Sequence, residues 1–159
     1  MPKVTKTTKK TEMASRATVS RPRKSSSLAW EAALIAAARA ARNNAHAPYS
    51  RFHVGAAVVD ERGRVHVGCN VENASYGLTI CAERNAVAAA IAAGAKEVRG
   101  VAVITGVRPP GTPCGACRQV LAEFGDDELP IWLAAPTGRA TKKRLGDFLP
   151  EAFRFKRRA

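Results

Sequence analysis

Three cysteines have a spacing that suits a catalytic metal centre. Cys114 and Cys117 are three residues apart, so they lie on one face if their segment is helical. Cys81 opens a second stretch of helical character and is available as a third thiolate. Three thiolates would hold a tetrahedral zinc ion with its fourth position open, which is typical of catalytic zinc. The spacing therefore predicts an open zinc site.

Glu83 follows Cys81 by two residues, which suits a carboxylate that lies beside the metal without binding it. An ordinary acidic residue in a first helical turn is the alternative, since the helix dipole favours negative charge there. For the thiols, the alternatives are a structural zinc knuckle and buried free cysteines. A structural site needs a fourth protein ligand, and the three histidines stand outside both cysteine motifs: His46, His53 and His66.

The two cysteine motifs, Cys81-Ala82-Glu83-Arg84 and Pro113-Cys114-Gly115-Ala116-Cys117, match the signature of the zinc deaminases. With cysteine as the first ligand, the chain resembles the small homotetrameric cytidine deaminases over about residues 28–153. The resemblance implies one Zn²⁺ per subunit, held by Cys81, Cys114 and Cys117. It also implies that Glu83 moves protons during hydrolysis of cytidine and 2′-deoxycytidine to the uridines and ammonia, a reaction of pyrimidine salvage.

The same resemblance implies substrate-binding roles for residues outside the zinc motifs. Phe52 and Val54 would line the base pocket, with core packing of a strand as a compatible alternative. Asn70 and Glu72 would hold the ribose through its 3′-hydroxyl, and a simple turn is the alternative for these two. The backbone amide of Ala82 would read the polar edge of the ring.

Two further features concern the surroundings of the zinc. The resemblance implies that Arg84 hydrogen-bonds the ligand sulfurs and offsets the negative charge of three thiolates around Zn²⁺. A solvated surface arginine is the alternative. Arg118 and Gln119 could assist. Cys69 stands in an apolar strand and is expected to be a small buried residue rather than a ligand.

The resemblance extends to a pocket shared between subunits. The run Leu149-Pro150-Glu151-Ala152-Phe153 is similar to the C-terminal motif of the family. There, the phenylalanine that matches Phe153, together with Ala74 and Tyr76, completes the pocket of a neighbouring subunit. A simple packing anchor near the C-terminus is the alternative. A homotetramer with nucleoside substrates is therefore the expected working unit.

The composition indicates one ordinary domain with charged ends. The chain has 159 residues, 46% of them hydrophobic, and no apolar run approaches the ~18 residues of a membrane span. No N-terminal stretch has the apolar region of a secretory signal, and cysteines at metal spacing argue against disulfides, so we expect a reducing, cytoplasmic location. Residues 1–27 carry eight lysines and arginines against one glutamate, which is +7 of the formal net charge of +13.

We expect residues 1–27 to be a basic disordered extension, residues 28–155 the deaminase domain and residues 156–159 a basic tail. The alternatives for the extension are a weak polyanion-binding arm, which is the only suggestion of a nucleic-acid partner, and an organelle transit peptide. The order of patterns predicts an α/β fold. The resemblance implies the three-layer α-β-α cytidine deaminase-like arrangement with a mixed central sheet.

The expected elements follow from periodicity and from turn residues. Helices are predicted over 28–44 with Ser27 as N-cap, over about 80–93 ending at Gly94, and from Pro113 to Gly125. Strands are predicted over 52–60, 64–72, 98–105 and 129–134, the first two joined by a turn at 61–63. Residues 136–144 read as a basic loop, followed by a last segment over 145–153.

Three other functions compete with cytidine deamination. A deaminase of the same architecture for another cytosine nucleoside, such as blasticidin S, shares the zinc motifs, which therefore cannot separate the two. A polynucleotide cytosine deaminase is suggested only by the basic extension. A non-catalytic zinc-binding module with a nucleic-acid arm is the rival from another class.

Overall fold

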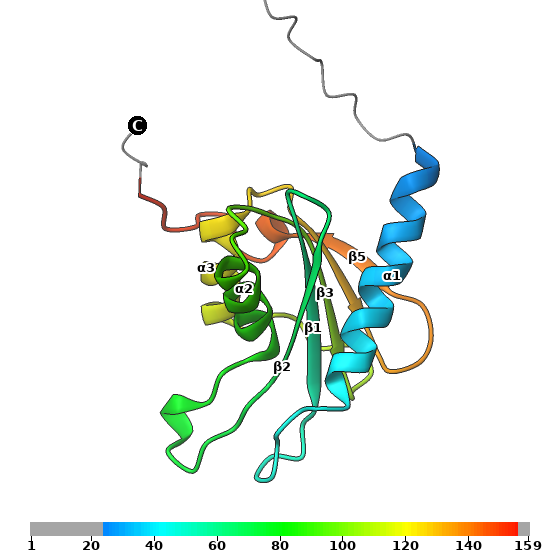
Figure 1. The fold of residues 1–159 in the computed structure, drawn as a ribbon. Helices are drawn as coiled ribbons and strands as arrows, with labels where there is room; N and C mark the ends of the chain where they lie inside the picture. Colours follow the sequence, from blue (N-terminus) through cyan, green and yellow to red (C-terminus); the bar gives the residue numbers. More distant parts are fainter. Residues whose placement is uncertain (1–23, 156–159) are drawn as a thin grey trace, which may run out of the picture.

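The computed structural model describes residues 24–155, and a mixed five-stranded sheet forms its centre (Figure 1). The strands run in the order β2-β1-β3-β4-β5, and of these pairs β3 and β4 are parallel while the others are antiparallel. Their bounds are Val54–Asp60 for β1, Val65–Cys69 for β2, Val98–Thr105 for β3, Pro130–Ala134 for β4 and Thr141–Arg144 for β5. The predicted α/β class with a mixed sheet is confirmed.

Helices cover both faces of this sheet (Figure 1). Helix α1 (Lys24–Arg42) lies on one face, and α2 (Ala82–Ala92) and α3 (Gly115–Phe124) lie on the other. Two short 3₁₀ turns, Tyr76–Leu78 and Leu145–Asp147, complete the elements. The three layers are those that the family resemblance implied. Within the described residues, no helix is long and apolar enough to cross a membrane.

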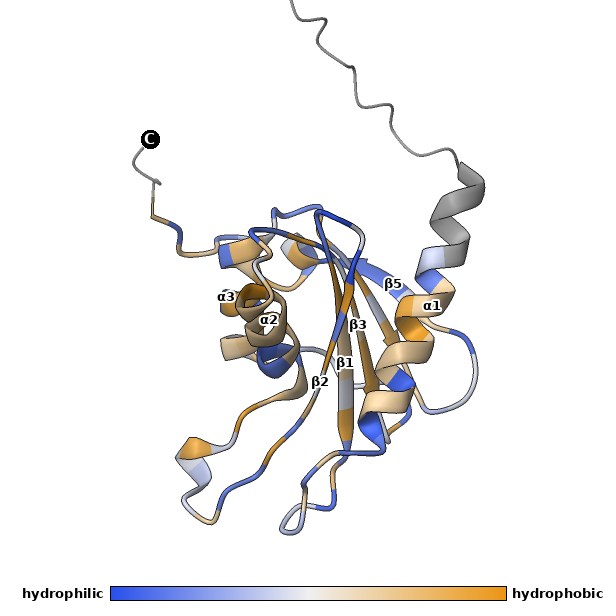
Figure 2. Cartoon of the chain, in the orientation of Figure 1, coloured by the Kyte–Doolittle hydropathy of each residue, from blue (hydrophilic) through white to orange (hydrophobic). Residues whose placement is uncertain are grey.

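The central strands explain why there are two cores. Side chains alternate along β1, so Ala56 and Val58 pack toward α2 and α3, while Ala57 and Val59 pack toward α1. Strand β3 is apolar and buried along almost its whole length, as the sequence predicted for a strand covered on both faces. Figure 2 shows the contrast between these hydrophobic central strands and the hydrophilic edge strand β5.

Two glycines allow the helices to lie directly on the sheet. A Cβ at Gly55 would lie 2.8 Å from the Cα of Arg42 on α1, and closer to the carbonyl oxygen of Ala38. A Cβ at Gly68 would lie 2.5 Å from the carbonyl oxygen of Ala82 on α2. Both helices therefore approach the sheet backbone to backbone at these points.

Several predicted boundaries differ from the structure. Helix α1 begins at Lys24, so Ser27 lies inside the helix and is not its N-cap. Pro113 precedes α3 instead of forming its first turn, because Cys114 is the N-cap. Gly94, which follows the end of α2, has φ 84°, as predicted for the left-handed position after a helix. The predicted basic extension over 1–27 was wrong in its last four residues, which belong to α1. Residues 1–23 and the predicted tail over 156–159 lie outside the described residues, and their disorder stays a prediction.

The predicted basic loop over 136–144 was partly wrong, because its last four residues form strand β5. Thr141 to Arg144 pair with β4 and are all exposed, so their side chains carry no apolar alternation that a sequence pattern could detect. The ammonium group of Lys142 lies 5.0 Å from the ring centre of Trp132 on β4. Pairing with a buried neighbour, rather than propensity, makes this segment a strand.

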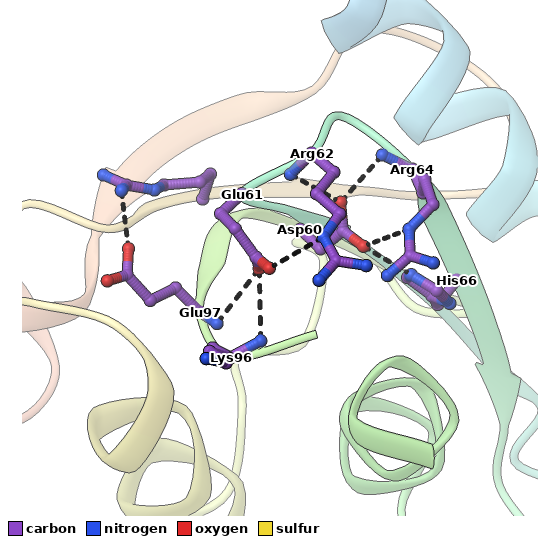
Figure 3. A network of polar contacts seen from close by, with 8 residues as sticks. Asp60, Glu61, Arg62, Arg64, His66, Lys96 and Glu97 are labelled. Carbon is purple, nitrogen blue, oxygen red and sulfur yellow. Dashed lines mark hydrogen bonds and ion pairs between the residues drawn. The ribbon is translucent and has the colours of Figure 1, made fainter. Parts of the chain in front are cut away.

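A buried carboxylate holds the hairpin between β1 and β2 (Figure 3). The Asp60 side chain is fully buried and accepts hydrogen bonds from the backbone of Arg62 and Arg64 at 2.9 Å each. It also accepts from Arg64 Nε at 2.8 Å and faces His66 Nε2 at 3.0 Å. Burial raises the pKa of Asp60, but together the hydrogen bonds from His66, Arg64 and Arg62 outweigh it and hold the pKa well below its usual range.

Asp60→Asn is expected to lower the free energy of unfolding at pH 7 by about 2 kcal/mol, because an amide NH₂ would face the donors of Arg64 and His66. The lowered pKa of Asp60 means that this stabilisation is present above about pH 4 and is lost as the pH falls further. Urea unfolding of both proteins from pH 7 to pH 3 measures it. A difference between them that stays constant or grows toward pH 3 would contradict the assignment.

Candidate metal centre and active site

Two helix N-termini bring the three thiols together. Cys81 is the N-cap of α2 and Cys114 is the N-cap of α3, while Cys117 lies in the first turn of α3. The Sγ atoms of Cys81 and Cys114 are 3.8 Å apart, and the three sulfurs all lie within 4.8 Å of one another. A helix N-terminus carries unpaired amides and the positive end of the helix dipole, which favour negative charge on the sulfurs held there.

This cluster fits a tetrahedral zinc ion. Zinc–sulfur bonds of about 2.3 Å at tetrahedral angles place neighbouring sulfurs about 3.8 Å apart, the separation seen between Cys81 and Cys114. That separation is also too long for a disulfide bond. Among residues 24–155, no histidine or carboxylate joins the three thiols. With these three thiols as its ligands, a zinc ion would keep a fourth position for water or substrate.

The protonation of the cluster is uneven. The pKa of Cys81 is lowered to about 6, chiefly by hydrogen bonding from Cys117. Hydrogen bonding from Cys114 and the positive charge of Arg84 lower it further, while burial acts in the opposite direction. The same hydrogen bond to Cys81, together with burial and the charge of Glu83, raises the pKa of Cys117. Because a thiol must lose its proton to bind zinc, metal binding at this cluster would release the proton held by Cys117.

Glu83 lies beside the thiols and is almost entirely buried, with 5% of its surface exposed. Burial in the first turn of α2 raises its pKa, and the charge of Cys81 raises it further, while a hydrogen bond with Cys117 acts in the opposite direction. A carboxyl group that is shielded from water and next to the open metal position can hold and return a proton. This placement fits a proton carrier better than a solvated helix-start residue.

Arg84 is half-buried on α2 and acts on the cluster through its charge, which lowers the pKa of Cys81. The structure shows no hydrogen bond between Arg84 and the sulfurs of the described cysteines, so the expected sulfur hydrogen bonds stay a prediction. Cys69 lies elsewhere, donating to the carbonyl oxygen of Asn44 at 3.3 Å, and it is not part of the cluster. It is only partly buried, less than the sequence suggested.

The two residues expected at the ribose lie just beyond β2, not on it, since β2 ends at Cys69. Asn70 is buried; its Oδ1 accepts from Val54 N and its Nδ2 donates to the carbonyl oxygen of Phe52, both at 2.8 Å. Glu72 is buried as well, and its carboxylate accepts hydrogen bonds from the loop before β1. Both side chains thus hold the segment that carries Phe52 and Val54.

The other predicted substrate residues lie in different surroundings. Phe52 is 40% exposed and precedes β1, whereas Val54 begins β1 and is buried. Ala82 is fully buried at the first position of α2. Tyr76 and Phe153 are 65% and 67% exposed, and Ala74 is exposed too. The ring of Phe153 contacts that of Phe155, with the ring centres 5.0 Å apart, and still leaves most of its surface open. The roles of all these residues stay predictions.

Sequence reasoning missed the residues that orient Glu72. The backbone amides of Tyr49 and Ser50 donate to Glu72 Oε2 at 3.0 and 3.2 Å, and the Ser50 hydroxyl donates to Oε1. The Ser50 hydrogen bond is the main cause of the lowered pKa of Glu72. Ser50 also accepts from the amide of Phe52 at 3.0 Å. A serine two residues before Phe52 was the available signal, but such turn residues are too common to identify a partner.

Arg118 and Gln119 tie α3 to neighbouring segments. Arg118 donates from Nε to the carbonyl oxygen of Pro113 at 2.7 Å and from Nη1 to that of Phe148 at 3.0 Å. Gln119 Nε2 donates to the carbonyl oxygen of Phe153 at 2.7 Å. The loop that delivers Cys114 and the segment that carries Phe153 are therefore both fastened to α3.

Comparison with known proteins agrees with this geometry. Residues 28–133 match the model of the cytidine and deoxycytidylate deaminase zinc-binding region. The cytidine deaminase of Sporosarcina psychrophila is 42% identical over 120 residues, covering 76% of this chain and 88% of that protein. The cytidine deaminase of Mycobacterium tuberculosis is 49% identical over 109 residues, covering 69% and 78%.

A solved structure is similar over the same region. The crystal structure of cytidine deaminase from Burkholderia pseudomallei shares 51% identity with this chain and superimposes with a TM-score of 0.73. The match covers 77% of this chain and 98% of that one. With the zinc-binding region matched across most of the described residues, this chain belongs to the cytidine and deoxycytidylate deaminase family.

Proposed function

We propose that the chain is a zinc-dependent hydrolase that converts cytidine and 2′-deoxycytidine to the uridines with release of ammonia, as in pyrimidine salvage. The observation that carries the proposal is the buried Glu83 beside three thiols within 4.8 Å of one another. Its relatives named cytidine deaminase support the choice of substrate. Cys81, Cys114 and Cys117 hold one zinc ion per subunit in this proposal.

The reaction adds water to C4 of the cytosine ring and removes the amino group. Zinc, when bound, supplies the Lewis acidity that makes water nucleophilic near neutral pH. Glu83 accepts the proton that the attacking water gives up and passes protons to N3 and then to the departing amino group. Water and cytidine are consumed, and uridine and ammonia are formed, so one carboxyl group serves as base and then as acid.

The sugar is held, in this proposal, by Asn70 and Glu72 through the 3′-hydroxyl, while Phe52 and Val54 line the base pocket and the Ala82 amide reads the ring edge. The hydrogen bonds that Glu72 accepts from Tyr49 and Ser50 keep it ionised and fix its direction. An oriented carboxylate is a good acceptor for a free hydroxyl group. It is a poor neighbour for a phosphate, whose negative charge it would repel.

A substrate panel tests the proposal. Cytidine and 2′-deoxycytidine are expected to be deaminated readily, and 3′-CMP and a single-stranded oligonucleotide at rates lower by about 10³-fold or more, because Glu72 would lose its partner and face a charge. Ultraviolet absorbance follows the loss of cytosine in each case. Blasticidin S is included in the panel as the rival nucleoside.

Each outcome of the panel identifies a function. Comparable rates on the oligonucleotide and on cytidine would refute the ribose assignment and favour a polynucleotide deaminase. Activity confined to blasticidin S would transfer the chain to that class of nucleoside deaminase. No deamination of any of the five compounds would leave the non-catalytic zinc-binding module.

A homotetramer is part of the proposal. The exposure of Tyr76 and Phe153 supports it, since a neighbouring subunit could cover these rings and, with Ala74, close the pocket. Light scattering coupled to size exclusion measures the subunit number.

We also propose that the enzyme works in the cytoplasm. The residues before α1 and residues 156–159 are basic extensions of the deaminase domain in this proposal. Arg84 balances the charge of the thiolates.

A further inference from the structure

Helix α2 lies on strand β2 without a side chain between them. Gly68 stands under the first two turns of α2, where a Cβ would be 2.5 Å from the carbonyl oxygen of Ala82 and closer to the amide nitrogen of Ala86. Ordinary contacts of a Cβ begin at 3.4 Å. Any side chain at position 68 would therefore separate the helix from the strand.

A hydrogen bond fixes the helix along the strand at the same place. Asn85 Nδ2, on the first turn of α2, donates to the carbonyl oxygen of Cys69 at 2.8 Å. This contact sets the register of α2 against β2, while Gly68 sets their distance. Both contacts lie within four residues of Cys81 or Glu83.

We propose that Gly68 and Asn85 are positioning residues, which hold the metal-binding end of α2 at a fixed distance from the chain that follows β2. The strand that α2 touches at Gly68 continues directly to Asn70 and Glu72. Gly68 thus connects the two halves of the site, the thiols and Glu83 on one side and the sugar-facing residues on the other. The kinetic part of the test rests on the proposed function, and the zinc part does not.

The expected effect of a methyl group at position 68 follows from the contact distances. Relieving a contact of 2.5 Å to 3.4 Å requires a movement of about 0.9 Å. In the described part of the chain, strand β2 lies at the edge of the sheet and pairs with β1 alone, so the helix and the strand can each shift. In both cases the distance between Glu83 and Glu72 changes, and a misplacement near 1 Å can cost about 100-fold in rate.

The experiment compares Gly68→Ala with Gly100→Ala. Position 100 on β3 offers the control, because its Cβ would lie 3.0 Å from the ring of Trp30 on α1 and 3.1 Å from that of Trp132 on β4, and none of the candidate site residues lies on α1, β3 or β4. Gly68→Ala is expected to lower kcat/KM for cytidine about 100-fold in folded, zinc-loaded protein and to release zinc to a chelator about 10-fold faster. Gly100→Ala is expected to lose thermal stability while keeping kcat/KM and zinc release within about threefold.

The results can overturn the proposal in two ways. Equal losses in the two variants would show that both glycines act only through stability. A Gly68→Ala protein with wild-type kinetics and zinc release would refute the positioning role.

If Gly68→Ala does not fold, Asn85→Ala is the deciding variant, because it removes one hydrogen bond without a clash. The expected result is a loss of about fivefold in kcat with faster zinc release, and unchanged values for both would refute the proposal. A wild-type protein that binds zinc but does not deaminate cytidine would refute the proposed function instead, leaving the zinc comparison valid.

Discussion

Glu83→Gln is expected to bind zinc as the wild type does and to lose about 10⁴-fold in kcat, the upper end of the range for general acid–base catalysis. The amide has nearly the size and shape of the carboxyl group, so the buried site beside Cys117 stays filled. It cannot accept a proton from water or return one to the ring. Metal analysis together with steady-state kinetics on cytidine measures both halves of this expectation.

The control for this variant is Glu97→Gln. Glu97 precedes β3 and forms a surface ion pair with Arg99. Its loss removes one carboxylate from the chain without touching the thiols, and its kinetics should equal those of the wild type. If Glu83→Gln loses its zinc, the carboxylate is a ligand rather than a proton carrier. If it keeps near-normal kcat, another group moves the protons.

Cys114→Ala and Cys117→Ala are each expected to lose zinc and at least about 10³-fold in activity, because two thiolates no longer hold the ion that activates water. The two substitutions differ in their effect on the fold. Cys117 is fully buried, so its loss also leaves a small cavity, whereas Cys114 is exposed. Zinc content by atomic absorption, measured alongside thermal unfolding, separates loss of metal from loss of folding.

Cys69→Ala provides the comparison within the same residue type. Its thiol donates to the carbonyl oxygen of Asn44 and is not part of the three-thiol cluster, so this variant should keep its zinc and its kinetics. A full zinc complement in Cys114→Ala would refute the three-thiolate site. Loss of zinc in Cys69→Ala would instead add a fourth thiol to it.

The thiol cluster was predictable because its information is local. A spacing of three residues within one helical turn places side chains on one face whatever the rest of the fold does, as for Cys114 with Cys117. Glu83 stays close to Cys81 because it follows that N-cap by two residues, in the first turn of the same helix. The apolar strand β3 was predictable for a related reason, since burial on both faces requires a continuous hydrophobic run. The layer order followed from the family resemblance.

The rest of the site depends on contacts between distant segments. Ser50 meets Glu72 across 22 residues, and Asn70 meets Phe52 across 18, so no spacing rule connects them. The charged residues of β5 form a strand because they pair with the buried strand β4. Gly68 reads as an ordinary glycine within a strand, and only the position of α2 shows why a side chain there would not fit.

Strand β5 also determines how this sheet meets other chains. Its exposed run Thr141-Lys142-Lys143-Arg144 places three cations along one edge, and a second strand arriving there would have to bring its own backbone up against that charge. The opposite edge, β2, carries the exposed side chains of Val65 and Val67 instead. The positive charge of β5 therefore disfavours addition of a strand from another chain at that edge, which is the step that starts aggregation. Addition of a strand would occur at the β2 edge instead.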